Sequence, residues 1–573
     1  MSNISYLNEL CKIWGLLYVY HPSVVRGDFD VNFETSLTKL LRKYLSIATD
    51  ETFAKAVKEL ISILKDENAD LVDLENNVTP DKNLDYKGFL LNRVHLGFSE
   101  DSTNGPYRNY WNVSYLNSFN PSTIDIRVNS KYKLRYTPDI YVKQDDPDKL
   151  ARILQTKLST HKPEDISNLS VEEKLLGLFK TWNVFKYFFP HYKDIQDKWE
   201  DNLENFIFDV LNSSSTEDYI HIIEKLTSIS RDAHVRLKYD ENIHAYAPKH
   251  SWTFPIQLNK VENKIIVLSS KDSKFNVGDE IIEINNKSIE EIEQDLRPLV
   301  SCSTEASFNW HLYGFLNGVF SGRENEKVTI KYKSKGSVKE TKLTYSLPWD
   351  YWKNNSPNPV SNIYNKNGKK VGYINLAKPK TGEEFEVELE KVFTTDSLIL
   401  DLRCYPQFWT GVSILPRICK EGAASGNFKV KVIEGPTVAE YSTLTVKCKD
   451  GINNFSYFIP VSSKPVYLKP IAVLVDFRTK SSPEDLCIYL KNLGRCTFIG
   501  SETSGTNGNV TSFKIPGDIK VKFTGMDVTY ADDSPFQRIG VPIDIEVKPT
   551  IEGITKGEDE VIERALDYLF SLD

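Results

Sequence analysis

Two adjacent serines follow an apolar segment and precede a predicted helix, a position that can support acyl transfer. The apolar segment 472–477 leads through a short loop to Ser481-Ser482-Pro483-Glu484. At a strand-to-helix turn, a serine hydroxyl lies beside the N–H groups of the helix N-terminus, which can stabilise an oxyanion. The same residues also predict a helix cap, with Pro483 in the first turn and Glu484 completing a capping box. Spacing alone leaves both interpretations open.

A second apolar segment, LILD (398–401), ends in a loop whose residues could also reach a site. It continues to Arg403 and then to a loop that contains Pro406. In α/β folds, chemistry is located where parallel strands run out into loops. Arg403 is interpreted either as a structural partner of Asp401 or as a clamp for a substrate carboxylate.

An internal repeat singles out one histidine. The segment WGLLYVYHP, which starts at Trp14, aligns with WNVFKYFFP, which starts at Trp182. Further along, AVKELISILKDENA aligns with IIEKLTSISRDAHV, so that Asn68 stands opposite His234. Two unrelated amphipathic helical hairpins could produce the same pattern by coincidence. If the repeat is real, the unequal pair indicates a site on the second copy.

Several motifs in the same order resemble one known family. Thr479-x-Ser481-x-x-Glu484 follows an apolar strand, and FIGSETSGTNGNVTSF (498–513) and GVPIDIEVKPTIEGITKGEDEVIERAL (540–566) come after it. This pattern resembles the serine peptidases of the tail-specific, C-terminal-processing and tricorn-core group. EEKLLGLFKTWNVFKYFFPHYKDI, SRDAHVRL, a PDZ-like stretch and the DLR strand also occur here in the family's order. The resemblance covers approximately residues 170–573.

The resemblance implies a nucleophile and an oxyanion hole. Ser481 holds the nucleophile position, and Ser482 supplies the oxyanion-hole N–H of the following residue. A second donor comes from the loop 405–411, for which we name Gln407 and Phe408. Family members usually have a glycine pair in this loop, whereas this chain reads Tyr-Pro-Gln-Phe-Trp from 405 to 409. Which amide completes the hole is therefore left open.

The resemblance also implies which residue is the general base. Members with a lysine base place it about 25 residues after the serine, where this chain has Thr506, which cannot serve as that base. Tricorn-like members use a histidine ahead of the PDZ-like domain, and His234 stands at the matching place. An imidazole suits this task because its ordinary pKa of about 6.5 allows proton exchange near neutral pH. The alternative for His234 is a hydrogen-bonded structural histidine.

A third residue is expected to orient the base. Tricorn-like members have a glutamate shortly before a Gly-Val turn, and here Gln537 precedes Gly540-Val541. The Gln537 amide oxygen could accept an imidazole N–H, although it could not stabilise imidazolium as a carboxylate does. The alternative is an exposed loop glutamine.

The predicted function is that of a serine-type peptidase acting through an acyl-enzyme, with a peptide or protein substrate and with no metal or cofactor. Two alternatives remain open. One is a catalytically impaired pseudo-peptidase that binds peptides, suggested by the 405–411 loop and by Gln537. The other is a hydrolase of small esters or amides on the same scaffold.

The predicted fold is multidomain, α+β and α/β. Short alternating stretches such as STIDIRV and KYKLRY predict strands in the N-terminal region, and Val277–Asn285 resembles a PDZ strand and turn, although a plain hairpin would read similarly. Alternating strands and helices in the last 230 residues predict a mostly parallel sheet. The expected units are an N-terminal domain with the partial repeat and a β-rich extension (1–165), a helical domain with the base (170–245), a PDZ-like domain (250–346) and an α/β catalytic domain of the ClpP/crotonase type (350–573).

Composition excludes several classes of protein. The 573 residues carry a net charge of −8 with no long block of one sign, which argues against a nucleic-acid-binding protein. The seven cysteines form no CxxC pair and are odd in number, so neither a zinc ribbon nor a complete disulfide framework is expected. No apolar run has the length of a membrane span. The expected location is cytoplasmic, although a periplasmic or secreted chain with its signal removed would read the same; the oligomeric state is not predicted.

Overall fold

The computed structural model places most of the chain in regular elements. It describes residues 2–26, 33–75, 87–98, 107–117, 123–155, 169–238, 252–313, 321–348, 351–354, 358–408, 410–420, 425–435, 438–445 and 464–572. Within these ranges, no helix is both long enough and apolar enough to span a membrane. The cysteines described there, at 11, 302, 404, 419, 487 and 496, are free thiols.

The two copies of the repeat begin with matching helices. Helix α1 (Asn3–Tyr20) and helix α6 (Val171–Phe188) each have 18 residues and a serine N-cap. They pack against each other in one hydrophobic core, in which Trp14 and Trp182 are fully buried. The amide of Asn183 donates to the Cys11 carbonyl at 3.0 Å across this contact. The first copy therefore supports the helical unit that carries His234.

The repeat continues into a later helix and a strand in each copy. Helix α4 (Asp50–Ser62) leads to β1 (Asp70–Asp73), and helix α9 (Thr216–Ser228) leads to β7 (Arg236–Lys238). The remaining helical elements of the two copies are α2 (Pro22–Arg26), α3 (Phe33–Tyr44), η1 (Tyr192–Asp194), α7 (Gln196–Asp201) and α8 (Leu203–Asn212).

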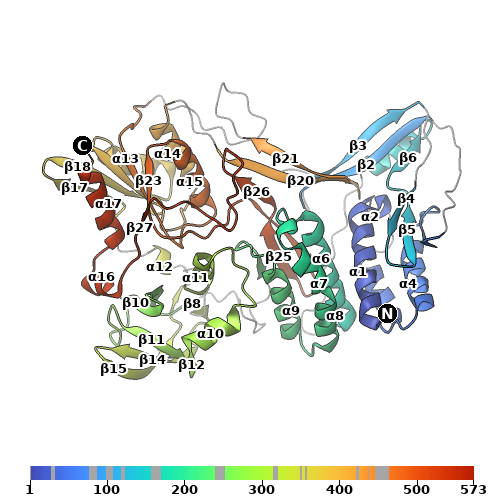
Figure 1. Ribbon diagram of the computed structural model, residues 1–573, viewed down its shortest axis with the longest axis horizontal. Coiled ribbons are helices and arrows are strands. Elements are labelled where there is room, and N and C mark those ends of the chain that lie inside the picture. The colour runs from blue at the N-terminus through green and yellow to red at the C-terminus, as the bar shows by residue number, and fades with distance from the viewer. Residues whose placement is uncertain are drawn as a thin grey trace.

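Each copy ends in a three-stranded antiparallel sheet, although the strands come from different parts of the chain. In the first copy, β1 pairs with β5 (Tyr132–Tyr136), which pairs with β4 (Ile124–Arg127). In the second copy, β7 pairs with β25 (Ile519–Thr524), which pairs with β24 (Val510–Ile515). Figure 1 shows this C-terminal hairpin, coloured red, beside the green helices of the second copy. The base-bearing unit is thus completed by the far end of the chain.

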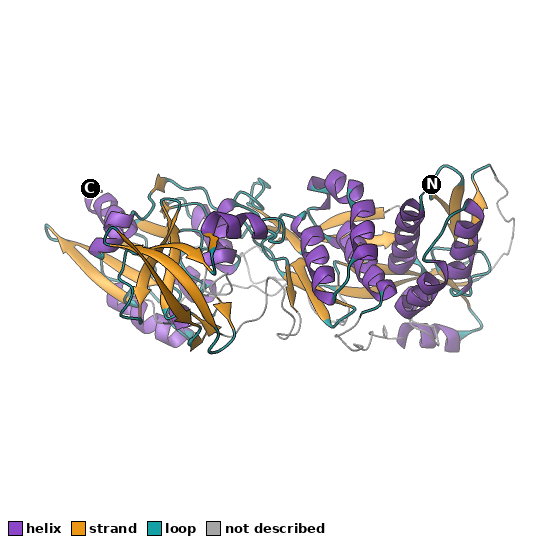
Figure 2. Ribbon diagram, turned by 90° about the horizontal axis from the view of Figure 1, so that it is seen from below, coloured by secondary structure: helices purple, strands orange, loops and turns teal. Residues whose placement is uncertain are grey.

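A six-stranded sheet, with four strands along its main path, connects the N-terminal unit to the α/β domain. Its order is β21 (Val438–Thr445), β20 (Asn427–Gly435), β2 (Gly88–Leu96) and β3 (Arg108–Leu116). β6 (Ile140–Lys143), followed by α5 (Pro147–Gln155), pairs with β2, and β26 (Met526–Thr529) pairs with β20. In Figure 2 the molecule is elongated, with the two termini toward opposite ends.

An antiparallel domain occupies residues 252–348. Its main sheet has the order β15 (Ser337–Thr344), β14 (Lys327–Ser334), β11 (Glu280–Ile284), β10 (Lys264–Ser270) and β9 (Ile256–Val261), and β12 (Lys287–Ser288) pairs with β11. A small sheet joins β8 (Trp252–Thr253) to β13 (Ser321–Gly322) and β16 (Leu347–Pro348). Helices α10 (Ile289–Leu296) and α11 (Glu305–Tyr313) follow β12. This arrangement is consistent with the PDZ-like prediction.

The α/β domain has a mostly parallel sheet covered on both faces. The order is β17 (Ser361–Lys366), β18 (Lys369–Asn375), β19 (Ser397–Asp401), β22 (Ile471–Val475), β23 (Cys496–Gly500) and β27 (Ile545–Glu546), and only β17 runs antiparallel to its neighbour. One core joins the sheet to α13 (Gly382–Val392), α14 (Gly411–Ile418) and α15 (Ser482–Asn492), and a separate core joins it to α17 (Glu560–Ser571). Two short helices, α12 (Tyr351–Asn354) and α16 (Ile551–Lys556), precede β17 and α17. The predicted fold class is confirmed.

Candidate functional site

Ser481 lies in a strained turn between β22 and α15. Its φ is +62° and its ψ is −115°, a conformation that side-chain-bearing residues rarely adopt. The residue occupies the N-cap position of α15, and its N–H donates to Glu484 Oε2 at 3.0 Å, so the cap interpretation describes the local contacts. An ordinary N-cap has extended backbone, however. The positive φ is instead typical of a turn that presents a nucleophile.

The buried carboxylate of Glu484 fixes the loop beside Ser481. It accepts hydrogen bonds from the Thr503 hydroxyl at 2.6 Å and from the N–H groups of Gly505 at 2.7 Å and Thr506 at 3.1 Å. Burial raises the pKa of Glu484 to about 7, and these hydrogen bonds oppose the rise. The Thr506 carbonyl accepts the Ser481 N–H at 3.0 Å, so the residue at the lysine position lies directly against the serine turn.

His234 lies in the turn between α9 and β7, with its ring nitrogen Nδ1 at 2.9 Å from the Thr524 hydroxyl. Burial lowers the pKa of His234 to about 4, the charge of Asp232 opposes this shift, and the nearby cations Lys480, Arg236 and Lys522 reinforce it. The imidazole is therefore neutral at neutral pH, which is the form that a general base requires.

Residues next to Ser481 and His234 are in direct contact. The ammonium group of Lys480 donates to the Ala233 carbonyl at 2.7 Å, and the Nε2–H of His311 donates to the same oxygen at 3.1 Å. The Lys480 ammonium group also lies 3.9 Å from the centroid of the Trp310 ring. Both His311 and Trp310 belong to α11, so the antiparallel domain also contributes to the site. The structure thereby brings the predicted nucleophile and base segments together across 247 positions of sequence.

Gln537 lies in the loop between β26 and β27, and its amide nitrogen is 3.5 Å from Ser303 Oγ, a long contact. Ser303 in turn accepts the Ala233 N–H at 3.1 Å and contacts the Thr506 hydroxyl. Gln537 also lines a cavity of about 490 Å³ with His191 and other residues. The role of Gln537 in orienting the base stays a prediction, since the contact recorded for His234 Nδ1 is with Thr524.

The predicted oxyanion-hole residues lie at two neighbouring strand ends. Ser482 is the first residue of α15, and the loop 405–408 follows β19. Gln407 is exposed, Phe408 packs partly buried against the α/β core, and Trp409 lies outside the described residues. Burial raises the pKa of Tyr405, and a hydrogen bond with the Ser481 side chain opposes that rise. A tyrosine hydroxyl thus lies next to the predicted nucleophile.

Arg403 is held by two carboxylates. Its guanidinium group pairs with Asp401 at 2.8 Å and with Asp559 at 2.9 Å, and only 5% of its side chain is exposed. The Tyr373 hydroxyl donates to Asp401 at 2.8 Å. The structure therefore supports the interpretation of Arg403 as a structural residue that joins β19 to the start of α17.

Sequence reasoning missed several residues of this site, namely Lys480, Thr524, Ser303, Trp310 and His311. Only Lys480 carried a signal, because it adjoins Ser481. The others lie in segments that reach the site through tertiary contacts. Within the described ranges, no group of three or more His, Cys, Asp or Glu side chains has the arrangement of a metal site.

Comparisons with known proteins agree with the fold and with the family resemblance. Residues 428–547 match peptidase family S41. Among curated proteins, no sequence matches this chain. The crystal structure of mature CPAF aligns at 15% identity and a TM-score of 0.53, covering 70% of this chain and 98% of that one.

Two further solved structures align with lower scores. The photosystem II D1 C-terminal processing protease has 14% identity, a TM-score of 0.37 and coverage of 67% of this chain and 96% of that one. The tricorn protease has 14% identity, a TM-score of 0.36 and coverage of 88% and 45%. The match of residues 428–547 confirms the predicted relation to the tail-specific peptidases and the prediction of a serine-type peptidase, and the fold agrees with it.

Proposed function

We propose that this chain hydrolyses peptide bonds in extended peptides or protein C-terminal segments through an acyl-enzyme on Ser481, with His234 as general base. The observation that supports this proposal is the contact between the two segments. Lys480 and Ala233, the residues before Ser481 and His234, share a hydrogen bond of 2.7 Å. The strained φ of Ser481 at the start of α15 adds a turn suited to a nucleophile.

The proposed reaction is a two-step acyl transfer. The His234 imidazole takes the Ser481 proton while Oγ attacks the scissile carbonyl carbon, and the resulting oxyanion faces the Ser482 N–H and a second donor from the loop 405–408. The intermediate collapses as His234 returns the proton to the leaving amine nitrogen, which leaves an ester on Ser481. Water then attacks the ester carbonyl with His234 again as base, which releases the acid and restores the serine hydroxyl.

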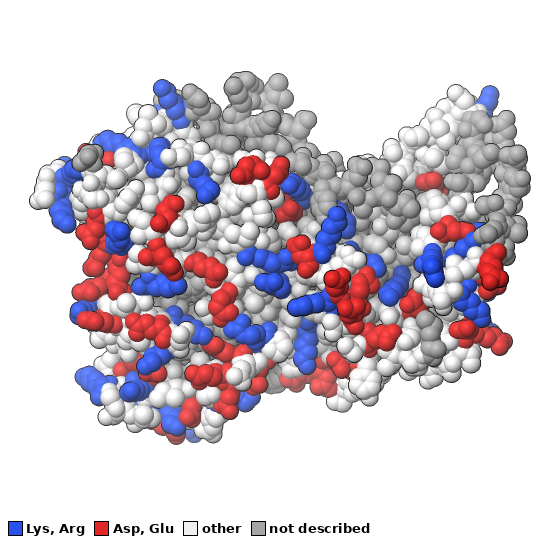
Figure 3. All heavy atoms as spheres, in the orientation of Figure 1, with Lys and Arg blue, Asp and Glu red and all other residues white. Residues whose placement is uncertain are grey.

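The proposed substrate is a peptide because the site lies where three units meet. Helix α11 of the antiparallel domain contacts Lys480 through Trp310, and the cavity beside Gln537 extends toward the end of α6, where it is lined by His191 and Lys193. We assign this cavity to a substrate side chain. Figure 3 shows acidic and basic side chains interspersed over the face of the molecule that Figure 1 presents to the viewer.

Labelling with a fluorophosphonate tests the nucleophile. We expect the wild-type protein and Ser482→Ala, which keeps its N–H, to be labelled, whereas Ser481→Ala is not. Equally weak labelling of the wild type and Ser481→Ala would contradict catalysis and favour a peptide-binding pseudo-peptidase, the alternative suggested by the 405–411 loop and by Gln537. If the protein is labelled and hydrolyses small esters but cleaves no peptide of a library, the result would support the small-molecule hydrolase instead.

A further inference from the structure

We infer that Asp232 and Thr524 form a hydrogen-bonded relay that orients His234 and keeps its proton on Nδ1. This inference rests on the proposed role of His234 as the base. His234 Nδ1 is 2.9 Å from Thr524 Oγ1, and Thr524 Oγ1 donates to Asp232 Oδ1 at 2.8 Å. Both Asp232 and Thr524 are completely buried. Neither is a catalytic residue, because each acts through the imidazole.

The directions of these hydrogen bonds follow from the groups themselves. A carboxylate only accepts, so the single hydroxyl proton of Thr524 points to Asp232. The oxygen of Thr524 then has only lone pairs to offer to the ring, and Nδ1 of His234 must be the donor. In a neutral imidazole the other nitrogen, Nε2, carries the lone pair. The relay therefore selects the tautomer that can accept a proton at Nε2.

The backbone fixes the relay in place. The Thr524 N–H donates to Asp232 Oδ2 at 2.8 Å, and the His234 N–H donates to Asp232 Oδ1 at 3.0 Å. Asp232 thus accepts three hydrogen bonds from two segments that are 292 positions apart. Because a carboxylate with three donors cannot rotate freely, the Thr524 hydroxyl has a defined place beside Nδ1 at the edge of the ring.

Charge on Asp232 also bears on the protonated state of the base. When His234 holds the serine proton, its positive charge lies one hydroxyl group away from the buried carboxylate of Asp232. The other charged or titratable groups that act on His234 are Lys480, Arg236 and Lys522, which oppose protonation, and the neighbouring His311. The carboxylate offsets part of the effect of these cations.

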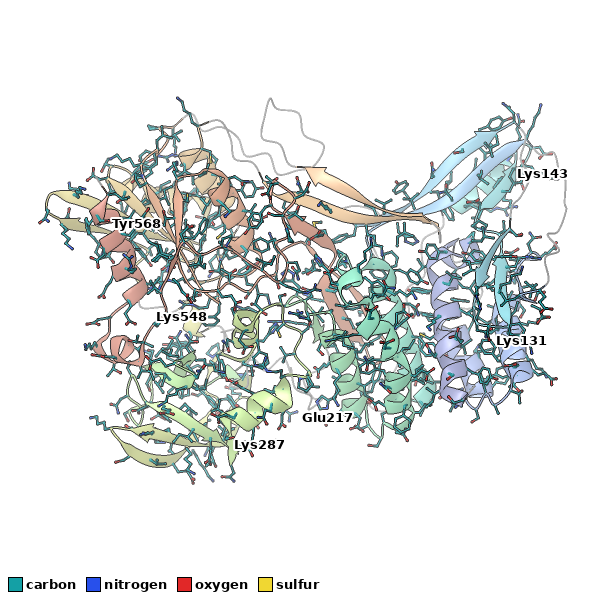
Figure 4. The ribbon with its side chains drawn as sticks, in the orientation of Figure 1. Lys131, Lys143, Glu217, Lys287, Lys548 and Tyr568 are labelled. Carbon is teal, nitrogen blue, oxygen red and sulfur yellow. The ribbon has the colours of Figure 1, made fainter. Side chains whose placement is uncertain are left out.

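The first copy of the repeat has a similar backbone frame around Asp66, with Asn68 in place of His234, although Asp66 Oδ2 also contacts His21 Nε2 at 3.2 Å. The Asn68 N–H donates to Asp66 Oδ1 at 2.9 Å, as the His234 N–H does to Asp232. The Thr137 N–H donates to Asp66 Oδ2 at 3.4 Å, as the Thr524 N–H does to Asp232. Figure 4 shows both units, with Lys131 marking the hairpin of the first copy and Glu217 the first turn of α9.

The strand registers establish that Thr137 and Thr524 are equivalent. Arg135 pairs with Asp70 in the first copy, and Lys522 pairs with Arg236 in the second, so each threonine lies two residues beyond matched partners. The Thr137 hydroxyl is buried and has no hydrogen-bond partner among the described residues. Only the second copy connects the hydroxyl to a ring, which indicates that the threonine gained a positioning role there.

The matched threonines provide the test. Thr524→Val removes the hydroxyl and keeps the shape of the side chain, whereas Thr524→Ser keeps the hydroxyl. Thr137→Val is the control in the first copy. We expect Thr524→Val to lower kcat for a peptide about 10- to 100-fold, which is part of the roughly 10²–10⁴-fold that a general base supplies, with KM little changed. We expect Thr524→Ser to recover most of the activity and Thr137→Val to match the wild type.

The outcomes separate the relay from a structural role. The inference would be overturned if Thr524→Val kept the wild-type kcat. It would also be overturned if Thr524→Ser had a kcat as low as that of Thr524→Val, or if Thr137→Val lowered kcat by the same factor. If Thr524→Val does not fold, nitrogen NMR of histidine-labelled wild-type protein, assigned with His234→Gln, decides: a proton on Nδ1 supports the relay and a proton on Nε2 overturns it. Wild-type turnover by His234→Gln would instead refute the proposed base, whatever the tautomer.

Discussion

The ammonium group of Lys480 donates a hydrogen bond of 2.7 Å to the carbonyl oxygen of Ala233. Burial lowers the pKa of Lys480 well below its ordinary value, and the charge of Arg236 adds to this effect. This ammonium group lies over the Trp310 ring, at 3.9 Å from its centroid. One side chain therefore links the serine turn, the histidine turn and α11.

Lys480→Met keeps the length of the side chain and removes both the charge and the hydrogen bond. We expect kcat/KM to fall about tenfold, since a misplacement of 1 Å can reduce a rate by more than that. Lys480 lowers the pKa of His234, so the acid limb of the kcat/KM profile should move to higher pH. Lys556→Met, at an exposed position, is the control. If the acid limb of Lys480→Met lay at the same pH as that of the wild type, Lys480 would not be lowering the pKa of His234.

The acid limb of the wild-type protein should lie unusually low. Burial lowers the pKa of His234 to about 4, and a general base works only in its unprotonated form. We therefore expect the titration of His234 itself to leave kcat/KM unchanged from pH 8 to about pH 5 and to lower it as the pH approaches 4, and the profile is measured in Glu484→Gln as well, to separate the titration of Glu484 near pH 7. A profile measured with a peptide substrate checks this, with circular dichroism to confirm folding at each pH. A limb between pH 6 and 7 that persists in Glu484→Gln would disagree with the environment of the ring.

Glu484→Gln should destabilise the protein. The Glu484 carboxylate accepts four hydrogen bonds, and a glutamine amide offers one acceptor oxygen in place of two. We expect the free energy of unfolding in urea to fall by about 1–3 kcal/mol, the usual result of leaving a buried donor unpaired. Fluorophosphonate labelling should slow as well, because the Ser481 turn loses its partner. Unchanged stability and labelling would show that the loop holds without this carboxylate.

Asp485→Asn should have the opposite effect on stability. Asp485 is partly buried, the one hydrogen bond of its carboxylate among the described residues is with the Asn507 amide at 3.5 Å, and burial raises its pKa to about 7. Between the ordinary pKa of about 4 and this value, the folded state binds more protons than the unfolded state, so its contribution to stability falls as pH rises.

Urea unfolding at pH 4.5, 6 and 8 measures this effect. The difference between the wild type and Asp485→Asn isolates the contribution of Asp485 from that of His234, whose lowered pKa gives a slope of the other sign. We expect the gain in Asp485→Asn to increase with pH by up to about 1.4 kcal/mol per pH unit and then to level above pH 7. Asp518→Asn, an exposed position, should show no such trend.

Sequence reasoning predicted the parts of the fold that depend on local pattern. The apolar runs predicted β19 and β22, and alternation predicted β4 and β5. The repeat of α1 in α6 could be detected because buried tryptophans stand at the same place in both. The equivalence of the two three-stranded sheets was missed because β25 follows β7 by almost 300 positions, although KLRYT (133–137) resembles KVKFT (520–524) residue by residue.

In the site, too, the residues that could be predicted are those that depend on local spacing in the sequence. Ser481 and Glu484 lie three residues apart in one turn, so their spacing carried the prediction. His234 came from comparison with Asn68 and from the family pattern. Thr524 could not be predicted, because only the pairing of β25 with β7 brings its hydroxyl to the ring. Tyr405 lies beside Ser481 because β19 and β22 are neighbours, a tertiary relation that loop composition does not reveal.

The division of the second copy between distant segments has a consequence for synthesis of the chain. The first copy contains all three strands of its sheet by residue 136, so it can fold early. The second copy lacks β24 and β25 until residue 524 has left the ribosome, and with them Thr524. His234, the proposed base, therefore gains its contact with Thr524 only when nearly the whole polypeptide has been made.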